Sequence, residues 1–254
     1  MSQSIISCRP GSYAPFVHLA YEHLAGLGVR YVEIEVPKPE ELEQVQAELT
    51  GYGLSAASLQ ARCDVRRPDV AAQVEAQMPA FQALRVKYMF VSCKADTTPL
   101  PTVYARLRQA GDVVKRHGVT IVMETHPDLI TSGDVALATM RGVDHPNVRV
   151  NFDTANIYYY NQGIDGVAEL RKIAPYVGAV HLKDSDGQYR SWHFTALGRG
   201  VVKFAETIKV LQGANFSGPY TLEIEGVEGE TRTERLVCDR VAESIGFLRG
   251  LGLL

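Results

Sequence analysis

The sequence has little of what marks secreted, membrane or disulfide-rich proteins. Its 254 residues include one tryptophan and four widely separated cysteines, Cys8, Cys63, Cys93 and Cys238. This pattern contains neither a Cys-x-x-Cys metal pair nor the cysteine density of a secreted scaffold, which favours a reduced cytoplasm. No basic start followed by an apolar segment indicates export, and no apolar run approaches the roughly 18 residues of a membrane span. We therefore expect a cytoplasmic protein without a membrane partner.

An excess of charge of one sign is also absent. The chain has 26 Lys and Arg residues against 29 Asp and Glu residues, a formal net charge of −3. Proteins that bind nucleic acids usually present a clustered basic face, so the composition argues against a nucleic-acid partner. A hydrophobic share of 46% is enough for a sizeable core. These values favour a globular protein that acts on a small molecule.

Short runs rich in β-branched and aromatic residues alternate with stretches of helical apolar spacing. The predicted strands are Ser4–Cys8, Tyr31–Val36, Leu54–Ala61, Tyr88–Ser92, Val119–Glu124, Val148–Asp153, Gly178–Leu182 and Tyr220–Ile224. Most begin about 30 residues apart, the length of one strand and helix unit. Eight units predict an α/β fold, a (β/α)8 TIM barrel forming a single domain over residues 1–254. An open doubly wound sheet is the alternative, but no Gly-x-Gly-x-x-Gly follows an early strand.

Acidic and imidazole side chains stand near the ends of four consecutive predicted strands. They are Glu124, Asp153, His181 and Glu223. The carboxyl ends of barrel strands face the mouth, where ligands bind. Each residue alone is more often a helix cap or ion-pair partner, but three carboxylates and one imidazole together suit Mn²⁺, Mg²⁺, Co²⁺ or Zn²⁺. Without a cation the acids would repel one another, so the four residues predict a divalent metal site.

Five short motifs occur in order along the chain. They are Met123–His126, Asn151–Asn156, Val180–Asp184, Ala196–Gly200 and Leu222–Glu223. In order and strand context they resemble the xylose isomerase-like TIM barrel superfamily, the sugar phosphate isomerase/epimerase family. Its members include ketose 3-epimerases, inosose-processing enzymes, hydroxypyruvate isomerase and endonuclease IV. The resemblance covers almost the whole chain and is specific to the superfamily rather than to one activity within it.

The resemblance implies that Glu124, Asp153, His181 and Glu223 hold one divalent metal ion, usually Mn²⁺ or Mg²⁺. It also implies that Glu124 and Glu223 are the catalytic proton-transfer groups, on opposite faces of the substrate. A metal bound to a carbonyl and its neighbouring hydroxyl acidifies the adjacent C–H and stabilises an enediolate. Return of the proton then inverts the centre or isomerises the sugar. We therefore expect a metal-dependent sugar isomerase or epimerase.

Two positions depart from the ketose 3-epimerase pattern. Asn156 stands at the position where those enzymes have a substrate-binding histidine, and Gly187 stands where they have an arginine. Lys183 or Arg190 would supply the missing cation, unless each is a solvated loop charge. The departures favour a keto-sugar, inosose or keto-glycoside over a plain ketohexose. No glycine-rich phosphate cradle is recognisable, which disfavours a sugar phosphate.

Several polar and aromatic residues near the predicted mouth are candidates for substrate contact. They are His126, Asn156, Lys183, Arg190, Trp192, His193 and Glu33. The connection Asp184–Gly200 holds three of them, and long connections with aromatic and glycine residues at a barrel mouth often close over a ligand. The alternative is that Trp192 only anchors this connection. The run Tyr158–Tyr160 either stacks on a sugar, faces a second subunit of a homo-oligomer, or simply packs a loop.

Three other functions are compatible with these residues. A metal-dependent lyase or dehydratase would use the same deprotonation, followed by loss of a group from the next carbon. An endonuclease IV-like phosphodiesterase would need a trinuclear zinc site, but the chain has Asn156 and Ser191–His193 at positions where that family has other ligands. Its mildly acidic composition also disfavours DNA. A non-catalytic sugar-binding barrel would bind metal without turnover.

Overall fold

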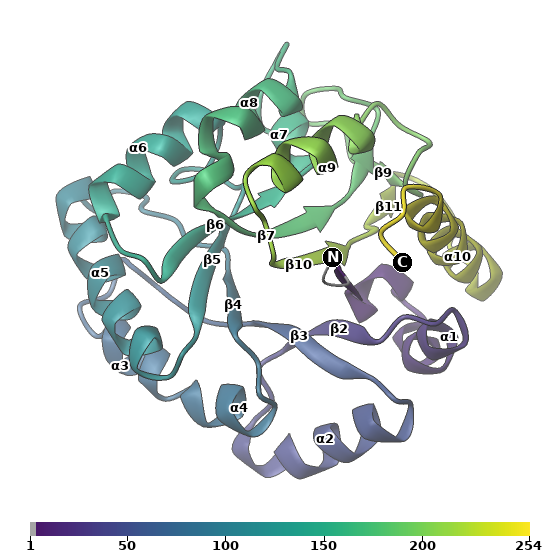
Figure 1. Ribbon diagram of the computed structural model, residues 1–254, viewed down its shortest axis with the longest axis horizontal. Helices are drawn as coiled ribbons and strands as arrows, with labels where there is room; N and C mark the ends of the chain where they lie inside the picture. Colours follow the sequence, from purple (N-terminus) through teal and green to yellow (C-terminus); the bar gives the residue numbers. More distant parts are fainter. Residues whose placement is uncertain (1–3) are drawn as a thin grey trace.

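Eight parallel strands close into a barrel in this computed structural model, which describes residues 4–254 (Figure 1). The barrel strands are β1 (Ile5–Cys8), β2 (Tyr31–Glu35), β3 (Ser55–Gln60), β4 (Tyr88–Val91), β5 (Thr120–Glu124), β6 (Val148–Asp153), β7 (Val177–Leu182) and β10 (Pro219–Leu222). Each strand pairs with its sequence neighbour, and β1 pairs with β10 to complete the ring. The predicted (β/α)8 barrel is confirmed.

Helices surround the barrel as an outer layer (Figure 1). They are α1 (Ala20–Gly26), α2 (Leu42–Gly51), α3 (Val70–Glu75), α4 (Met78–Ala83), α5 (Leu100–Arg116), α6 (Gly133–Val143), α7 (Asn156–Tyr159), α8 (Gly166–Ile173), α9 (Phe204–Gly213) and α10 (Glu234–Gly250). In α5, Val103, Leu107 and Val114 are buried at the spacing of one helix face, which packs the helix on the strands. Within the described part of the chain, no helix is both long and apolar enough to span a membrane.

The amphipathic stretch between Pro68 and Arg85 forms two short helices rather than one continuous helix. The first helix, α3, ends at Glu75, and α4 begins at Met78 with Pro79 in its first turn. Proline has no backbone N–H, and its ring would clash with the carbonyl of residue 75 in a continuous helix. The chain therefore breaks before Pro79, where proline is well tolerated.

The insertion after β7 forms a small sheet beside the barrel. Its strands are β8 (Asp184–Ser185), β9 (His193–Thr195) and β11 (Gly226–Val227), in the order β11-β9-β8. The buried Asp184 carboxylate accepts four backbone N–H groups, those of Ser185, Gly198, Gly200 and Val202, at 2.8–3.1 Å. A Cβ at Gly200 would lie 2.1 Å from the Ser185 carbonyl oxygen, so this close approach requires glycine.

Replacing Asp184 with alanine is expected to lower the free energy of unfolding by about 3 kcal/mol or more. The change leaves backbone N–H groups without the acceptor that Asp184 provides, and each lost bond to a charged group costs about 1.5–3 kcal/mol. Urea denaturation measures the effect. As a control, Asp134→Ala removes an exposed carboxylate that pairs only with Lys172 at the surface. It should cost less than about 1 kcal/mol, and an equal effect of the two variants would contradict the role given to Asp184.

Candidate metal centre

The four predicted ligands meet at the mouth of the barrel. Glu124 and Asp153 end β5 and β6, His181 lies in β7, and Glu223 follows β10. These strands are consecutive in the ring, and the register places Asp153 beside His181. One donor atom from each of the four residues lies within 4.8 Å of the others. The cluster therefore has the composition and spacing to hold a metal ion.

Two buried polar atoms of this cluster have no hydrogen-bond partner among residues 4–254. They are Asp153 Oδ2 and His181 Nδ1. The other Asp153 oxygen accepts the backbone N–H groups of Ala155 and Asn156, both at 2.8 Å. His181 Nδ1 lies 3.2 Å from Glu223 Oε2, without hydrogen-bond geometry. Buried polar atoms almost always have partners. A cation bound by both of these atoms would give each of them a partner.

Two carboxylates of the cluster, Asp153 and Glu124, are in surroundings that disfavour their ionised forms. Burial raises the pKa of Asp153 to about 6. Burial, with the nearby charge of Glu223, also raises the pKa of Glu124. Both effects disfavour the ionised form, and a divalent cation would reverse them by supplying positive charge at the same place.

A buried chain of hydrogen bonds orients His181. Its Nε2 lies 3.1 Å from Glu33 Oε1, and the Ser58 hydroxyl donates to Glu33 Oε2 at 2.6 Å. The ring also stacks on Phe90 at 4.6 Å between centroids. A carboxylate behind a histidine fixes the N–H on the nitrogen that faces the carboxylate, here Nε2, and leaves the other nitrogen, Nδ1, free for a metal. Glu33, a predicted substrate contact, is buried behind His181 and is not among the residues that line the pocket.

Without a metal, His181 holds an extra proton. Burial disfavours the charged imidazole, but the carboxylates of Glu33 and Glu223 outweigh burial and raise the pKa of His181 to about 10. A cation bound at Nδ1 must displace a proton from the ring. Metal binding at this centre is therefore coupled to proton release.

The buried Lys183 and the partly buried Arg9 also contact the ligands. Lys183 Nζ lies 3.3 Å from Glu223 Oε2 and 3.7 Å from Asp153 Oδ2, and it pairs with Glu225. The Arg9 guanidinium pairs with Glu223. Lys183 was a predicted substrate contact, and its ammonium group lies at the metal centre itself.

Arg9 and Glu225 are members of this site that the sequence prediction missed. A signal was available for both. Arg9 directly follows the first strand, and Glu225 lies two residues beyond Glu223. Their position at strand ends is the criterion that selected the four ligands.

A pocket of about 460 Å³ lies over the metal centre. Its lining residues are Arg9, Gln60, Phe90, Ser92, Glu124, His126, Asn156, Tyr159, Tyr160, Lys183, Trp192, Phe194, Glu223 and Glu225. Of the predicted substrate contacts, His126, Asn156, Lys183 and Trp192 line this pocket. Arg190 and His193 do not, and the exposed Arg190 guanidinium lies over its neighbour Tyr189.

Aromatic rings form one side of the pocket. The Trp192 ring contacts Tyr159 and Phe194 edge to face, with centroids 6.0 and 5.1 Å away. Tyr160 packs against His126 at 4.9 Å, whereas Tyr158 is buried. The connection after β7 thus reaches the mouth of the barrel and places Trp192 in the pocket wall.

The family of xylose isomerase-like TIM barrels matches residues 21–249 of the chain. The chain belongs to this family. The resemblance first indicated by the five short motifs is confirmed, and four of the motif residues, Glu124, Asp153, His181 and Glu223, meet at the mouth.

Named relatives of this xylose isomerase-like barrel catalyse different reactions. It is 29% identical to the 3-dehydroshikimate dehydratase of Bacillus anthracis over 80 residues, which are 31% of this chain and 28% of that enzyme. The matched segment thus spans less than a third of the dehydratase. This relative is an enzyme, which agrees with the prediction that the present protein is an enzyme.

Two solved structures have similar folds over nearly their full lengths. D-psicose 3-epimerase from Clostridium cellulolyticum H10, with D-tagatose, has a TM-score of 0.78 at 16% identity, with 97% of this chain and 98% of that chain covered. A xylose isomerase-like TIM barrel protein from Mycobacterium smegmatis, in complex with magnesium, has a TM-score of 0.77 at 18% identity, with coverage of 99% and 97%. At these identities the comparison shows the common fold.

Proposed function

We propose that this protein is a divalent-metal-dependent isomerase or epimerase of a polyhydroxylated ketone. The cluster of Glu124, Asp153, His181 and Glu223 beneath a pocket of about 460 Å³ carries the proposal. A pocket of this size suits a small molecule such as one sugar unit. The polar lining suits a substrate rich in hydroxyl groups.

The donor set suits Mn²⁺ or Mg²⁺, with Co²⁺ or Zn²⁺ as alternatives, because three of its four side chains supply carboxylate oxygen. When bound, such an ion would polarise the substrate carbonyl and stabilise negative charge on its oxygen. The two orphaned atoms, Asp153 Oδ2 and His181 Nδ1, support its placement among these residues.

Glu124 and Glu223 are the proposed proton-transfer groups. Their strands, β5 and β10, are separated in the ring by β6 and β7, so the two carboxylates approach the pocket from different sides. Burial raises the pKa of Glu124, whose Oε1 accepts the Asn156 side-chain amide at 3.3 Å. Glu124 forms no ion pair within residues 4–254, whereas Arg9 and Lys183 both pair with Glu223, so Glu124 is the better proton acceptor of the two.

Glu223 is held in the opposite state. Burial alone would raise its pKa, but the charges of Lys183, Arg9 and His181 outweigh burial and hold the pKa of Glu223 well below its usual range. Environments that push two carboxylates apart in pKa assign them different roles in proton transfer. We propose that Glu124 removes the proton beside the carbonyl and that Glu223 faces the other side of the same carbon.

A dehydratase is the second candidate, because of the match to 3-dehydroshikimate dehydratase. The same proton removal leads to elimination when a hydroxyl group leaves from the next carbon. The substrate, rather than the four ligands, would decide between the two outcomes. The phosphodiesterase alternative has less support, since residues 4–254 hold one cluster of this kind, with a single histidine, where a trinuclear zinc site needs more ligands.

A substrate panel tests the proposal. With Mn²⁺ or Mg²⁺ present, we expect turnover of a ketoinositol, a 3-keto-glycoside or a related keto-sugar. NMR and mass spectrometry identify the product. An epimerised or isomerised product keeps the substrate mass, whereas dehydration of 3-dehydroshikimate or a keto-sugar releases one water. Efficient turnover of fructose or psicose alone would show that Asn156 and Gly187 are not specificity-determining. Absence of turnover across ketohexoses, ketoinositol, keto-glycosides, sugar phosphates and 3-dehydroshikimate would contradict the proposed function.

A further inference from the structure

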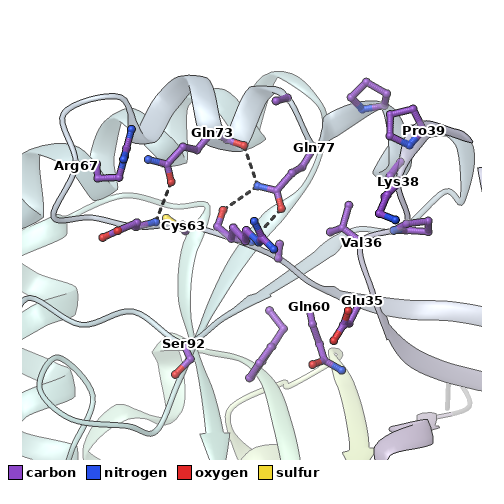
Figure 2. Close-up of a pocket in the computed structure, with 18 of the residues that line it drawn as sticks. Glu35, Val36, Lys38, Pro39, Gln60, Cys63, Arg67, Gln73, Gln77 and Ser92 are labelled. Carbon is purple, nitrogen blue, oxygen red and sulfur yellow. Dashed lines mark hydrogen bonds between the residues drawn. The ribbon is translucent and has the colours of Figure 1, made fainter. Parts of the chain in front are cut away.

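A second and larger cavity, of about 1150 Å³, opens beside the metal centre. It lies at the ends of β2, β3 and β4, and Gln60, Phe90 and Ser92 line both it and the pocket over the metal. Figure 2 shows Gln60 and Ser92 on the strand side of the cavity, with Gln73 and Gln77 on the helical side opposite. A ligand seated at the metal centre can therefore extend into this cavity.

Another side of the metal pocket is lined by aromatic rings. Trp192, Tyr159 and Phe194 form an aromatic wall there through edge-to-face and tilted contacts. Arg190 and His193, expected to bind the far end of the substrate, line neither cavity. Because Gln60, Phe90 and Ser92 line both cavities, the distal part of a substrate would lie toward the ends of β2 to β4.

Positive charge dominates the lining of the larger cavity. Its charged side chains are Lys38, Arg62, Arg66, Arg67, Lys94, Glu35 and Asp64. Three of the five cations are neutralised by neighbours: Lys38 by Glu41, Arg66 by Asp64 and Asp96, and Arg67 by Asp69.

Arg62 and Lys94 form no ion pair with any residue in 4–254, and the same holds for Glu35. Two uncompensated cations therefore face the cavity against one free carboxylate, in a chain whose net charge is −3.

Both free cations follow residues that line both cavities. Arg62 lies two residues beyond Gln60, and the Gln77 side chain accepts the Arg62 backbone N–H at 2.9 Å and donates to the Arg62 carbonyl oxygen at 2.8 Å, which holds the backbone at this position. Lys94 lies two residues beyond Ser92, which lines both the larger cavity and the pocket over the metal. The cations thus stand along the route from the metal centre into the cavity.

The larger cavity has no free aromatic ring for a second neutral sugar to stack on. Phe90 is the one aromatic residue among its lining residues, and its ring is already stacked on His181. Beside apolar residues such as Val36, Leu42 and Ala80, the lining offers guanidinium and ammonium groups, which bind carboxylates and phosphates through charge-assisted hydrogen bonds.

We propose that the larger cavity binds an anionic group, a carboxylate or a phosphate, on the part of the substrate distal to its carbonyl. Arg62 and Lys94 are the binding cations. This inference rests on the proposed function for the position of the carbonyl end, and it narrows the substrate class to acidic keto-sugars or keto-acids of similar size.

Calorimetric binding to the Mn²⁺-loaded protein tests the inference without requiring turnover. The probes are neutral D-fructose, carboxylated 5-keto-D-gluconate and D-fructose 6-phosphate. At least one anionic probe is expected to bind about tenfold or more tightly than fructose at low salt, as one charge-assisted bond would give. The advantage should shrink at high salt. The tighter of the two anionic probes identifies carboxylate or phosphate as the group bound.

The matched variants are Arg62→Gln with Lys94→Gln, and Lys38→Gln with Arg67→Gln as the control. The first pair should remove the anionic advantage and leave fructose binding unchanged. The control pair removes two cations of the same cavity that are already ion-paired, and it should change affinity by less than about twofold.

Equal binding of the three probes, no binding of any, or equal losses in both double variants would overturn the anionic subsite. Loss of metal-dependent turnover with anionic binding intact would instead count against the proposed function alone.

Discussion

Glu124→Gln and Glu223→Gln are each expected to lower kcat by about 10²- to 10⁴-fold, with a much smaller change in KM. Glutamine keeps the size of the side chain and one oxygen, but it cannot accept or return a proton. Steady-state kinetics on an accepted substrate measures the effect. Because both residues also belong to the metal cluster, the metal content of each variant must be measured beside its rate.

Glu48→Gln is the matched control, since Glu48 is exposed on α2, outside the pocket lining. It should leave both constants within about twofold of the unaltered protein. A loss confined to metal content, fully restored by added Mn²⁺, would show that the two glutamates serve as ligands without transferring protons.

Turnover in D₂O gives an independent result for the same pair. Proton removal by a carboxylate allows exchange with solvent, so the product should carry deuterium on the carbon next to the carbonyl. Product formed without solvent deuterium would contradict the two-carboxylate scheme. Rapid internal transfer or a hydride shift would then describe the reaction better.

The second large effect is expected from the metal. The protein should contain one divalent ion per chain by elemental analysis, and a strong chelator should abolish turnover until Mn²⁺ or Mg²⁺ is restored. A ligand at 100 times its Kd stabilises the folded state by about 2.7 kcal/mol. For a chain of this size, that corresponds to a rise in Tm of about 5–10 °C.

Asp153→Asn provides the structural test of the same centre. Asp153 Oδ2 is one of the two orphaned buried atoms, and the amide removes its charge while preserving its shape. Loss of a residue that hydrogen-bonds to a metal ligand lowers metal affinity by about 10- to 100-fold. Loss of the charge of a ligand itself should lower metal affinity by at least as much. The barrel should stay folded by circular dichroism. Protein without bound metal, together with activity unaffected by a chelator, would remove the basis of the proposed function.

The fold and the ligand set were predictable from sequence because their signals are local. Strand and helix patterns recur about every 30 residues, and the carboxyl ends of barrel strands face one mouth. Asp153 and His181 could therefore be paired from their positions alone, and the register confirms this. The break before Pro79 was not predicted, although its cause is equally local, since proline within a helical pattern ends the helix.

The missing parts of the prediction depend on contacts between distant residues. Glu33 bonds to His181 across 148 positions, and no pattern around Glu33 reveals that partner. The placement of Arg190 and His193 depends on the small sheet that β8 and β9 form with β11, whose pairings are not encoded in strand spacing. The charge balance of the larger cavity was equally hidden, because it depends on which arginines and lysines find local carboxylates.

The pairing of β1 with β10 brings Arg9 to the metal centre. The Ser7 and Thr221 hydroxyls bond at 2.6 Å, Ser12 accepts the backbone N–H of Ile224, and Arg9 pairs with Glu223, across 212 to 214 positions. Contacts of such sequence separation require closure of a very long loop, which is slow compared with formation of neighbouring strand and helix units. The four ligands lie on or directly after four adjacent strands, β5, β6, β7 and β10, so they can gather before the ring closes. The ion pair of Arg9 with Glu223 is therefore expected to form late in folding, together with ring closure.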